Sequence, residues 1–442
     1  MEAFRDLDIR EENEKVILLN TNNCHWVKMK KSIYEGIKES DDEERIIRYL
    51  DGKYGLFQNV KQCEKPNIKS IYFAVTNKCN MNCPFCSMNS GPNVSTKNDL
   101  SIQEITDTVL PKIKNFTPTK VVVSGGEPLV RKDLKTILKL FAEIFGKEKM
   151  VLQTNGLLMN MEVLKEIEPY VGAIEFSVEY FFDNSEMKNR LTEVFEYMVS
   201  KKIVLAFSFV VDRNTRKYLL DAIDLGHLYD AIFTMRMVSP VGRATYGIKE
   251  AEICDSKFIL ETYYCVVKHI IEKKYFDENI SSAFLGNIRA KRHCGAFGGI
   301  LAIRSNGDIK MCSNFKDEKY SIGNICDLSE ENIVKALNDK LNDEECIDLF
   351  CVDKKEQCID CEIKYFCSGP CTAELAENKR DVEDIFEMCY SKKILTKYMM
   401  FYFEKNKSDE ENLVVLKEYI ESSCPDIAKK WENKKCIISH WK

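Results

Sequence analysis

Residues 79–86 read Cys79-Asn80-Met81-Asn82-Cys83-Pro84-Phe85-Cys86 and follow the apolar run Ile71-Tyr72-Phe73-Ala74-Val75. The apolar run predicts a buried strand, so the three cysteines occupy a loop at its carboxyl end. A [4Fe–4S] cluster takes four thiolate ligands, and the C-x3-C-x2-C spacing supplies three. One iron is then open to a ligand from outside the protein. A zinc knuckle is the alternative, although zinc sites prefer C-x2-C pairs and four protein ligands.

Apolar runs and amphipathic stretches alternate after this loop, which is typical of a parallel α/β sheet or barrel. With the first strand they give six β/α units, which fit a partial (β/α)6 barrel. Active sites in such barrels lie at the carboxyl ends of the strands. The expected strands are 71–75, 120–124, 150–153, 173–178, 203–211 and 231–238, and the expected helices are 102–114, 132–145, 162–167, 186–200 and 216–225.

Further motifs stand at three of the predicted strand ends. Gly125-Gly126-Glu127-Pro128 follows the second strand, and its glycines allow the backbone to approach a ligand closely. Gln153-Thr154-Asn155-Gly156 ends the third strand, and Ser177-Val178-Glu179 ends the fourth. Together with the three-cysteine loop, these motifs resemble the signature of the radical S-adenosylmethionine (SAM) enzymes.

The resemblance implies that the amino acid end of SAM occupies the open iron of a cluster held by Cys79, Cys83 and Cys86. A reduced cluster then cleaves SAM to methionine and a 5′-deoxyadenosyl radical. Glu179 and Tyr180 depart from the family's Ser-x-Asp-Gly, which makes the ribose and carboxylate contacts there less defined. Arg190 is a carboxylate partner or a surface arginine. The implied SAM contacts are Phe85 beside the adenine, Gly125, Gly126, Glu127, Pro128, Asn155, Ser177, Glu179 and Arg190.

The chain contains 19 cysteines among 442 residues, yet no secretory signal and no apolar run long enough to span a membrane. This usage predicts metal or redox chemistry in a cytoplasmic protein rather than disulfides. The net charge of −6 and the lack of a basic patch argue against nucleic acid as a partner.

A second cysteine system occupies residues 294–400, the C-terminal cysteine region. It consists of Cys294, Gly307 and Cys312, then Cys358, Cys361, Cys367, Cys371 and Cys389. This pattern resembles the SPASM extension of radical SAM peptide and protein maturases. The resemblance implies two auxiliary [4Fe–4S] clusters, the first held by Cys294, Cys312 and Cys371 and the second by Cys358, Cys361, Cys367 and Cys389. Zinc ribbons are the alternative, but seven cysteines divide poorly into four-ligand sites.

The fourth ligand of the first auxiliary cluster is not evident. The sulfatase-maturase branch places a cysteine just before the first SPASM cysteine and an acidic residue after the second, whereas residues 285–291 hold no cysteine and Ser313 follows Cys312. Cys346 or Cys351 can close the site; otherwise a substrate thiolate can bind the iron. His293 is expected to be structural. The other cysteines, expected in ordinary packing, are Cys24, Cys63, Cys254, Cys265, Cys326, Cys424 and Cys436.

Residues 15–20 and 25–29 predict two strands joined by a turn, and helices are expected at 31–39 and 41–50. This start resembles the winged-helix leader-binding domain, or RiPP recognition element, of peptide maturases. Such a domain binds a precursor peptide at a sheet edge. A capping subdomain on the barrel is the alternative. A further helix is expected at 391–403.

The expected fold is therefore α/β: a partial (β/α)6 radical SAM barrel with a C-terminal SPASM iron–sulfur domain and a small N-terminal winged-helix-like domain. The resemblance implies a maturase that takes a hydrogen atom from a ribosomal precursor peptide and installs a cysteine thioether crosslink. Its cofactors would be three [4Fe–4S] clusters and SAM, and its electron donor a flavodoxin or ferredoxin. Alternatives are carbon–carbon crosslinking, decarboxylation, sulfatase-maturase-like oxidation, a non-catalytic iron–sulfur carrier and a zinc scaffold. The expected domains are 1–65, 68–245, a bridge at 246–293, 294–400 and a helical tail at 401–442.

Overall fold

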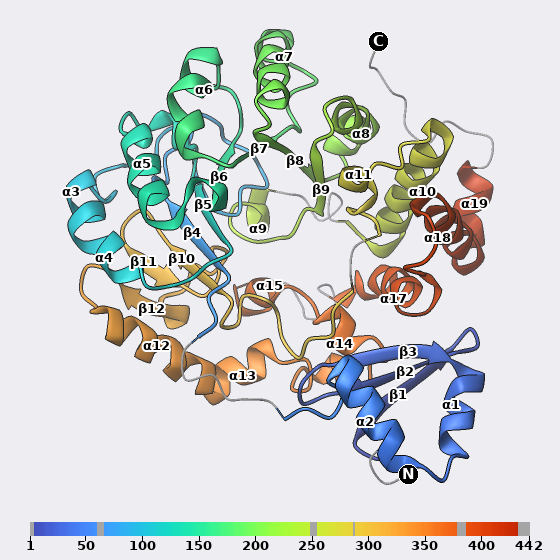
Figure 1. Ribbon diagram of the computed structural model, residues 1–442. Helices are drawn as coiled ribbons and strands as arrows, with labels where there is room; N and C mark the ends of the chain where they lie inside the picture. The colour runs from blue at the N-terminus through green and yellow to red at the C-terminus, as the bar shows by residue number, and fades with distance from the viewer. Residues whose placement is uncertain (1–3, 60–65, 248–253, 286–287, 378–385, 432–442) are drawn as a thin grey trace.

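A nine-stranded sheet forms the centre of the molecule (Figure 1). The computed structural model describes residues 4–59, 66–247, 254–285, 288–377 and 386–431. The strand order is β12-β11-β10-β4-β5-β6-β7-β8-β9, and the six strands from β4 to β9 are all parallel. They are β4 (Ser70–Ala74), β5 (Lys120–Ser124), β6 (Met150–Thr154), β7 (Ala173–Ser177), β8 (Val204–Val211) and β9 (Ile232–Met237). The predicted parallel α/β sheet is confirmed.

Helices cover the outer face of the curved sheet, so its strands are buried on both sides (Figure 1). Val121, Val122 and Val123 in β5 are at most 1% exposed, which explains the continuous apolar runs in the sequence. The covering helices are α3 (Ile102–Glu104), the π-helical η2 (Ile105–Val109), α4 (Leu110–Ile113), α5 (Leu134–Phe145), α6 (Met161–Ile167), α7 (Ser185–Ser200), η6 (Thr215–Tyr218) and α8 (Leu219–Leu228). Short 3-10 turns are η3 (Pro128–Val130), η4 (Lys147–Lys149) and η5 (Glu168–Tyr170).

Side-chain caps mark where these helices begin. Ser101 and Glu104 form a capping box, while Asn160 and Asn184 accept hydrogen bonds from the amides of Val163 and Met187. The helix expected at 102–114 is interrupted by the π segment η2.

Three short strands of the C-terminal cysteine region extend the barrel sheet. They are β10 (Ile300–Ile303), β11 (Asp308–Lys310) and β12 (Ser321–Asn324). β10 pairs in parallel with β4, and β11 and β12 follow as antiparallel neighbours. The sheet therefore crosses the boundary expected at residue 294. These strands were not expected from the sequence, because each spans only three or four residues.

The N-terminal segment forms a separate three-stranded antiparallel sheet with two helices. Its elements are β1 (Leu7–Glu12), β2 (Lys15–Asn20), β3 (Trp26–Lys30), α1 (Lys31–Lys38) and α2 (Glu43–Tyr54). β2 is buried on both faces, since Val16 and Leu18 pack into the small domain while Ile17 and Leu19 pack against Cys358 and its neighbours. The charged sequence of β1 explains why this strand was not expected.

Helices fill the rest of the chain, and α18 and α19 lie beside α10 (Figure 1). None of the helices in the described ranges is long and apolar enough to cross a membrane. The helices after β9 are α9 (Ala244–Gly247), α10 (Ser256–Lys273), α11 (Glu278–Ser281), η8 (Glu318–Tyr320), α12 (Glu330–Asn342), α13 (Glu344–Phe350), η9 (Glu356–Cys358), α14 (Lys364–Cys367), α15 (Thr372–Glu377), α17 (Cys389–Lys397), η10 (Tyr398–Tyr402), α18 (Asp409–Ser423) and α19 (Pro425–Trp431).

Candidate active site and cysteine clusters

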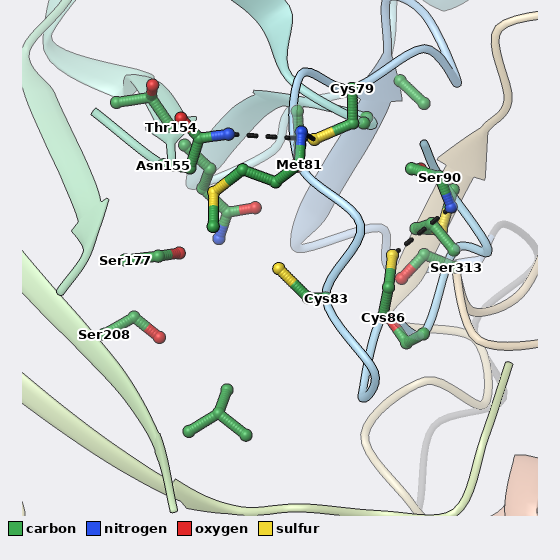
Figure 2. Close-up of a pocket in the computed structure, with 18 of the residues that line it drawn as sticks. Cys79, Met81, Cys83, Cys86, Ser90, Thr154, Asn155, Ser177, Ser208 and Ser313 are labelled. Atoms are coloured by element: carbon green, nitrogen blue, oxygen red, sulfur yellow. Dashed lines mark hydrogen bonds between the residues drawn. The ribbon is translucent and has the colours of Figure 1, made fainter. Parts of the chain in front are cut away.

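A cavity of about 330 Å³ opens at the carboxyl ends of the barrel strands. Cys79, Cys83 and Cys86 line it from the loop after β4. Figure 2 shows this loop on one side and the side chains of Thr154, Asn155, Ser177 and Ser208 on the other. Burial raises the pKa of the Cys83 thiol to about 11 and also raises that of Cys79. The thiols therefore favour the protonated form until a cation binds and displaces the protons.

The two glycines of the Gly-Gly-Glu-Pro motif are required by the cysteine loop itself. A Cβ on Gly125 would lie 2.2 Å from the carbonyl oxygen of Thr76, and one on Gly126 would lie 2.2 Å from that of Lys78. The Gly126 amide donates a 2.8 Å hydrogen bond to Thr76. Both glycines line the cavity, but their close approach is to protein backbone. This turn therefore fixes the entry to the cysteine loop.

Glu127 is buried and connects the Gly-Gly-Glu-Pro turn to the end of β6 through hydrogen bonds. Its side chain is 0% exposed and accepts hydrogen bonds from Thr154 Oγ1 (2.8 Å), the Asn155 amide (2.7 Å) and the Leu129 amide (3.0 Å). Burial raises the pKa of this carboxyl, while the three hydrogen bonds oppose the shift. Neither Glu127 nor Pro128 is among the cavity-lining residues, in contrast to the expected contact with SAM.

Asn155 and Ser177 lie where the sequence predicts, on the cavity wall. The Asn155 side chain donates to Asn80 Oδ1 (2.8 Å) and lies 3.7 Å from Cys79 Sγ. Arg190 is not brought to the cavity, because its guanidinium donates to the carbonyl oxygens of Met159 (2.9 Å) and Leu157 (2.8 Å). It supports the turn after Asn155 from outside.

Phe85 lines the cavity and stacks on Tyr180, with ring centroids 6.3 Å apart. The Tyr180 hydroxyl hydrogen-bonds to the Cys83 thiol. The tyrosine at this departure from the family motif therefore contacts one of the predicted cluster ligands.

Glu179 also lines the cavity, and its side chain is 3% exposed. It accepts a 2.5 Å hydrogen bond from the Val210 amide. Burial raises the pKa of Glu179 to about 7, and the hydrogen bonds and Arg236 oppose the shift. A carboxyl in this position can accept hydrogen bonds from ligand hydroxyls when it is ionised.

Arg243, which is not among the residues predicted from the sequence, holds the cysteine loop in place. Arg243 follows β9, and its guanidinium donates to the carbonyl oxygens of Cys83 (2.7 Å) and Ser90. Its amide donates to the Cys86 carbonyl (2.9 Å). A Cβ on the preceding Gly242 would lie 2.3 Å from the Ser87 carbonyl oxygen, so only glycine fits. Gly242 and Arg243 lie beyond the end of β9 and match no motif, so no signal in the sequence identifies them.

The four cysteines predicted to bind the second auxiliary cluster share one cavity of about 200 Å³ in the C-terminal cysteine region. Three lysines also line it, which makes the site suited to an anionic group. Burial raises the pKa of Cys389 to about 11. The lining cysteines are Cys358, Cys361, Cys367 and Cys389.

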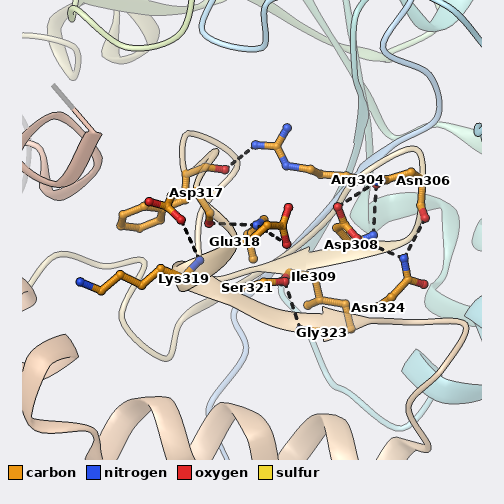
Figure 3. Close-up of polar contacts among 12 residues, drawn as sticks. Arg304, Asn306, Asp308, Ile309, Asp317, Glu318, Lys319, Ser321, Gly323 and Asn324 are labelled. Carbon is orange, nitrogen blue, oxygen red and sulfur yellow. Dashed lines mark hydrogen bonds and ion pairs between the residues drawn. The ribbon is translucent and has the colours of Figure 1, made fainter. Parts of the chain in front are cut away.

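The other three predicted ligands are also neighbours. Cys312 lies within electrostatic range of Cys371 and Cys294, and burial raises its pKa to about 11. Arg304, labelled in Figure 3, holds the loop after Cys312, because its guanidinium donates to the carbonyls of Ser313 (3.1 Å) and Phe315. Ser313 also lines the cavity of Cys79, so the two cysteine systems meet there.

Two cysteines were candidates for a fourth ligand. Cys346 is buried in α13, where its amide donates to Asp343 and its thiol contacts the same carboxylate. The backbone of Cys351 forms a β bridge with His293, the residue before Cys294. Cys351 is therefore the nearer candidate, and an open iron stays a prediction. Cys63 and Cys436 lie outside the described residues.

Residues 73–224 match the model of the radical SAM superfamily. These residues carry the three-cysteine loop and most of the cavity wall described above. Residues 73–224 therefore form a radical SAM domain, and the chain is an enzyme.

Two curated relatives show how far the similarity extends along the chain. The probable GTP 3′,8-cyclase of Methanococcus aeolicus is 24% identical over 315 residues, which cover 67% of this chain and 98% of that protein. The radical SAM cyclopropyl synthase TigE of Paramaledivibacter caminithermalis is 24% identical over 337 residues, or 69% of this chain and 68% of that protein.

Solved structures share the fold at low identity. Streptococcus suis SuiB bound to S-adenosylmethionine has a TM-score of 0.52 and 17% identity, covering 86% of this chain and 98% of SuiB. SuiB was also solved with its precursor peptide SuiA. Native anSMEcpe with bound AdoMet has a TM-score of 0.56 and 16% identity, covering 79% of this chain and 99% of that chain.

Cys79, Cys83 and Cys86 offer three thiols to one [4Fe–4S] cluster, the cofactor that the radical SAM match implies. Within the described ranges, no three His, Cys, Asp or Glu side chains converge closely enough to hold one metal ion. Ligands of a [4Fe–4S] cluster bind different irons and stay apart, whereas zinc ligands surround one point. Cys79, Cys83 and Cys86 would hold the cluster that binds SAM, and the polar strand ends would hold SAM beside it.

Proposed function

We propose that this chain is a radical SAM peptide maturase that removes a hydrogen atom from a ribosomal precursor peptide and installs a cysteine thioether crosslink. The observation that carries the proposal is the shared wall at Ser313, where the cavity of Cys79, Cys83 and Cys86 reaches the residue after Cys312. A substrate in this cavity lies between the proposed SAM site and the proposed first auxiliary cluster.

The chemistry divides between cofactor and protein. SAM bound to a reduced cluster supplies a carbon radical that removes one hydrogen atom from the substrate. The protein positions the substrate carbon that loses its hydrogen atom and excludes water. The substrate cysteine loses its proton, and its sulfur forms the C–S bond with that substrate carbon. One electron remains, and an iron–sulfur cluster is the class of acceptor that the C-terminal cysteine region would provide. A flavodoxin or ferredoxin would supply the electron that starts the reaction.

Charge in the cavity favours a peptide over a nucleoside triphosphate. Among its described lining residues the charged ones are Arg236, Arg304, Glu175 and Glu179. Arg304 already donates to two carbonyls, and Arg236 lies 3.9 Å from Glu175. A triphosphate requires several uncompensated cations, which this wall does not offer. The likeness to GTP 3′,8-cyclases nevertheless makes GTP the second candidate substrate.

The N-terminal sheet supports a peptide substrate in a second way. β1 and β3 are its edge strands, and an extended peptide can add to such an edge through main-chain hydrogen bonds. SuiB, which has the same overall fold, was solved with its precursor peptide SuiA. We therefore assign residues 1–65 as the leader-binding domain, with a capping subdomain as the alternative.

The test uses the anaerobically reconstituted enzyme with SAM, dithionite and a cysteine-containing peptide encoded beside its gene. A thioether product lacks two hydrogens, and its joined cysteine resists alkylation. Carbon–carbon crosslinking also removes two hydrogens but leaves every cysteine alkylatable, whereas decarboxylation removes carbon dioxide. Turnover of GTP with an unchanged peptide would overturn the proposal. A Cys79→Ala/Cys83→Ala/Cys86→Ala variant is the control for background chemistry.

A further inference from the structure

Lys355 is buried without a partner. The residue is 7% exposed, and its ammonium nitrogen has no hydrogen-bond partner in the described structure. The backbone fixes its place, because Lys355 directly precedes η9 and its carbonyl accepts a 2.7 Å hydrogen bond from the amide of Cys358, the last residue of that turn. The adjacent Lys354 is different, since its side chain is 55% exposed and lies 3.9 Å from Asp348.

The surroundings of this ammonium are thiols from both proposed auxiliary clusters. Burial lowers the pKa of Lys355, and the groups that oppose the shift are Cys358, Cys294, Cys351 and Cys371, in that order. A Cβ placed on Gly369 would lie 3.3 Å from Lys355 Nζ and 3.6 Å from Cys358 Sγ. The lysine therefore stands between the cavity of Cys358 and the group formed by Cys294, Cys312 and Cys371.

An isolated buried ammonium is costly, because neither water nor a counter-charge compensates for lost hydration. Proteins keep such a group where an anion is bound. Neutral thiols do not supply that charge, whereas an iron–sulfur cluster with four thiolates is anionic in its common states. Net charge and hydrogen bonds to the sulfurs also set the reduction potential of a cluster. A fixed cation beside a cluster stabilises the reduced form, which carries one more negative charge.

We propose that Lys355 is a positioning residue that pairs with the auxiliary cluster held by Cys358, Cys361, Cys367 and Cys389 and raises its reduction potential. This inference rests on the proposed function, because it requires the auxiliary clusters. Lys355 makes this cluster an easier destination for the electron left after bond formation. Each cluster gains one electron on reduction, and the substrate is its source in the reaction.

The experiment measures potential and iron content rather than turnover. The full chain carrying Cys79→Ala, Cys83→Ala and Cys86→Ala isolates the auxiliary clusters, which are reconstituted and titrated with dithionite under an EPR readout. Lys355→Met, Lys355→Arg and Lys354→Met are compared in this background. Lys354→Met is the matched control, because it removes the same charge from the neighbouring exposed position.

We expect Lys355→Met to lower the midpoint potential of the auxiliary cluster that Cys358 helps to hold. Lys355→Arg should leave this potential close to that of the unmodified chain, and Lys354→Met should have little effect on it. A tenfold change in the oxidised-to-reduced ratio corresponds to about 59 mV for one electron. Full iron loading with an unchanged potential in Lys355→Met would overturn the inference.

If Lys355→Met loses iron, the arginine variant decides the outcome. Loading restored by arginine supports a requirement for positive charge, whereas equal loss in both variants indicates a packing role and overturns the inference. Failure of the proposed function is read separately, because the unmodified chain would then leave the cysteine-containing peptide unchanged whatever the potentials of the Lys355 variants.

Discussion

The carboxylate of Glu127 accepts a 2.7 Å hydrogen bond from the backbone amide of Asn155, so one strand-end motif of the barrel orients the next. Asn155 in turn donates to Asn80 on the cysteine loop. A change at Glu127 therefore reaches the cavity through the backbone of Asn155.

Replacing Glu127 with Ala should weaken SAM binding about tenfold and lower the melting temperature. The variant leaves buried donors at Thr154 and Asn155 unpaired, and each unsatisfied buried group costs about 1–3 kcal/mol. Glu127→Gln retains one acceptor and should lose less. Calorimetric SAM titration and thermal unfolding measure both effects. Weaker SAM binding with unchanged stability would instead indicate direct contact with SAM.

The cysteine sets should load iron independently. The fully reconstituted chain should bind about twelve irons, following from three four-iron clusters. The triple variant of Cys79, Cys83 and Cys86 should retain about eight and form no 5′-deoxyadenosine. Iron and sulfide analysis measures the first effect and chromatography the second. Loss of all iron in the triple variant would contradict separate sites.

Arg243→Met should weaken retention of the SAM-binding cluster. The substitution removes the guanidinium bonds to Cys83 and Ser90, and hydrogen bonds to charged groups contribute about 1.5–3 kcal/mol. Bleaching of visible absorbance in air should be faster than in the unmodified enzyme. Lys139→Met removes an exposed charge on α5 and is the control. Equal bleaching rates would show that the clamp has no effect on the cluster.

Glu179 should make the apoprotein less stable as the pH rises. Its folded pKa is raised to about 7, so its favourable contribution is complete below the unfolded value near 4.5 and is lost as pH rises through 7. Glu179→Gln mimics the neutral form and should gain stability relative to the unmodified chain between pH 5 and pH 8. Urea unfolding at both values measures this gain. A stability difference independent of pH would contradict the shifted pKa.

Local patterns sufficed for the barrel because its strands are largely apolar and most are followed by an amphipathic helix. β5 begins and ends at the expected residues, Lys120 and Ser124. The π segment at Ile105–Val109 lies inside an otherwise helical pattern, so its spacing alone does not reveal it. β10 was missed since its parallel pairing with β4 joins residues more than two hundred positions apart.

The site residues also fall into two groups, those that a motif placed correctly and those whose role depends on contacts in the folded structure. Motif spacing placed Asn155, Ser177 and Glu179 on the cavity wall, because strand ends converge in a parallel barrel. Spacing did not show that the Glu127 carboxylate is turned into the protein or that Arg190 binds backbone carbonyls. Arg243 and Lys355 were missed because their importance comes from tertiary neighbours rather than from a motif.

The parallel pairing of β10 with β4 has a consequence for engineering. β4 leads into the loop of Cys79, and β10 and β11 lead into the loop of Cys312, so both loops are mounted on one hydrogen-bonded sheet. The spacing between the two sets of cysteines is therefore built into the barrel wall and does not depend on a hinge. A chimaera that takes the C-terminal cysteine region from a relative must therefore contain a β10 strand that can still pair with β4. Otherwise the exchange will also change the structure of the barrel.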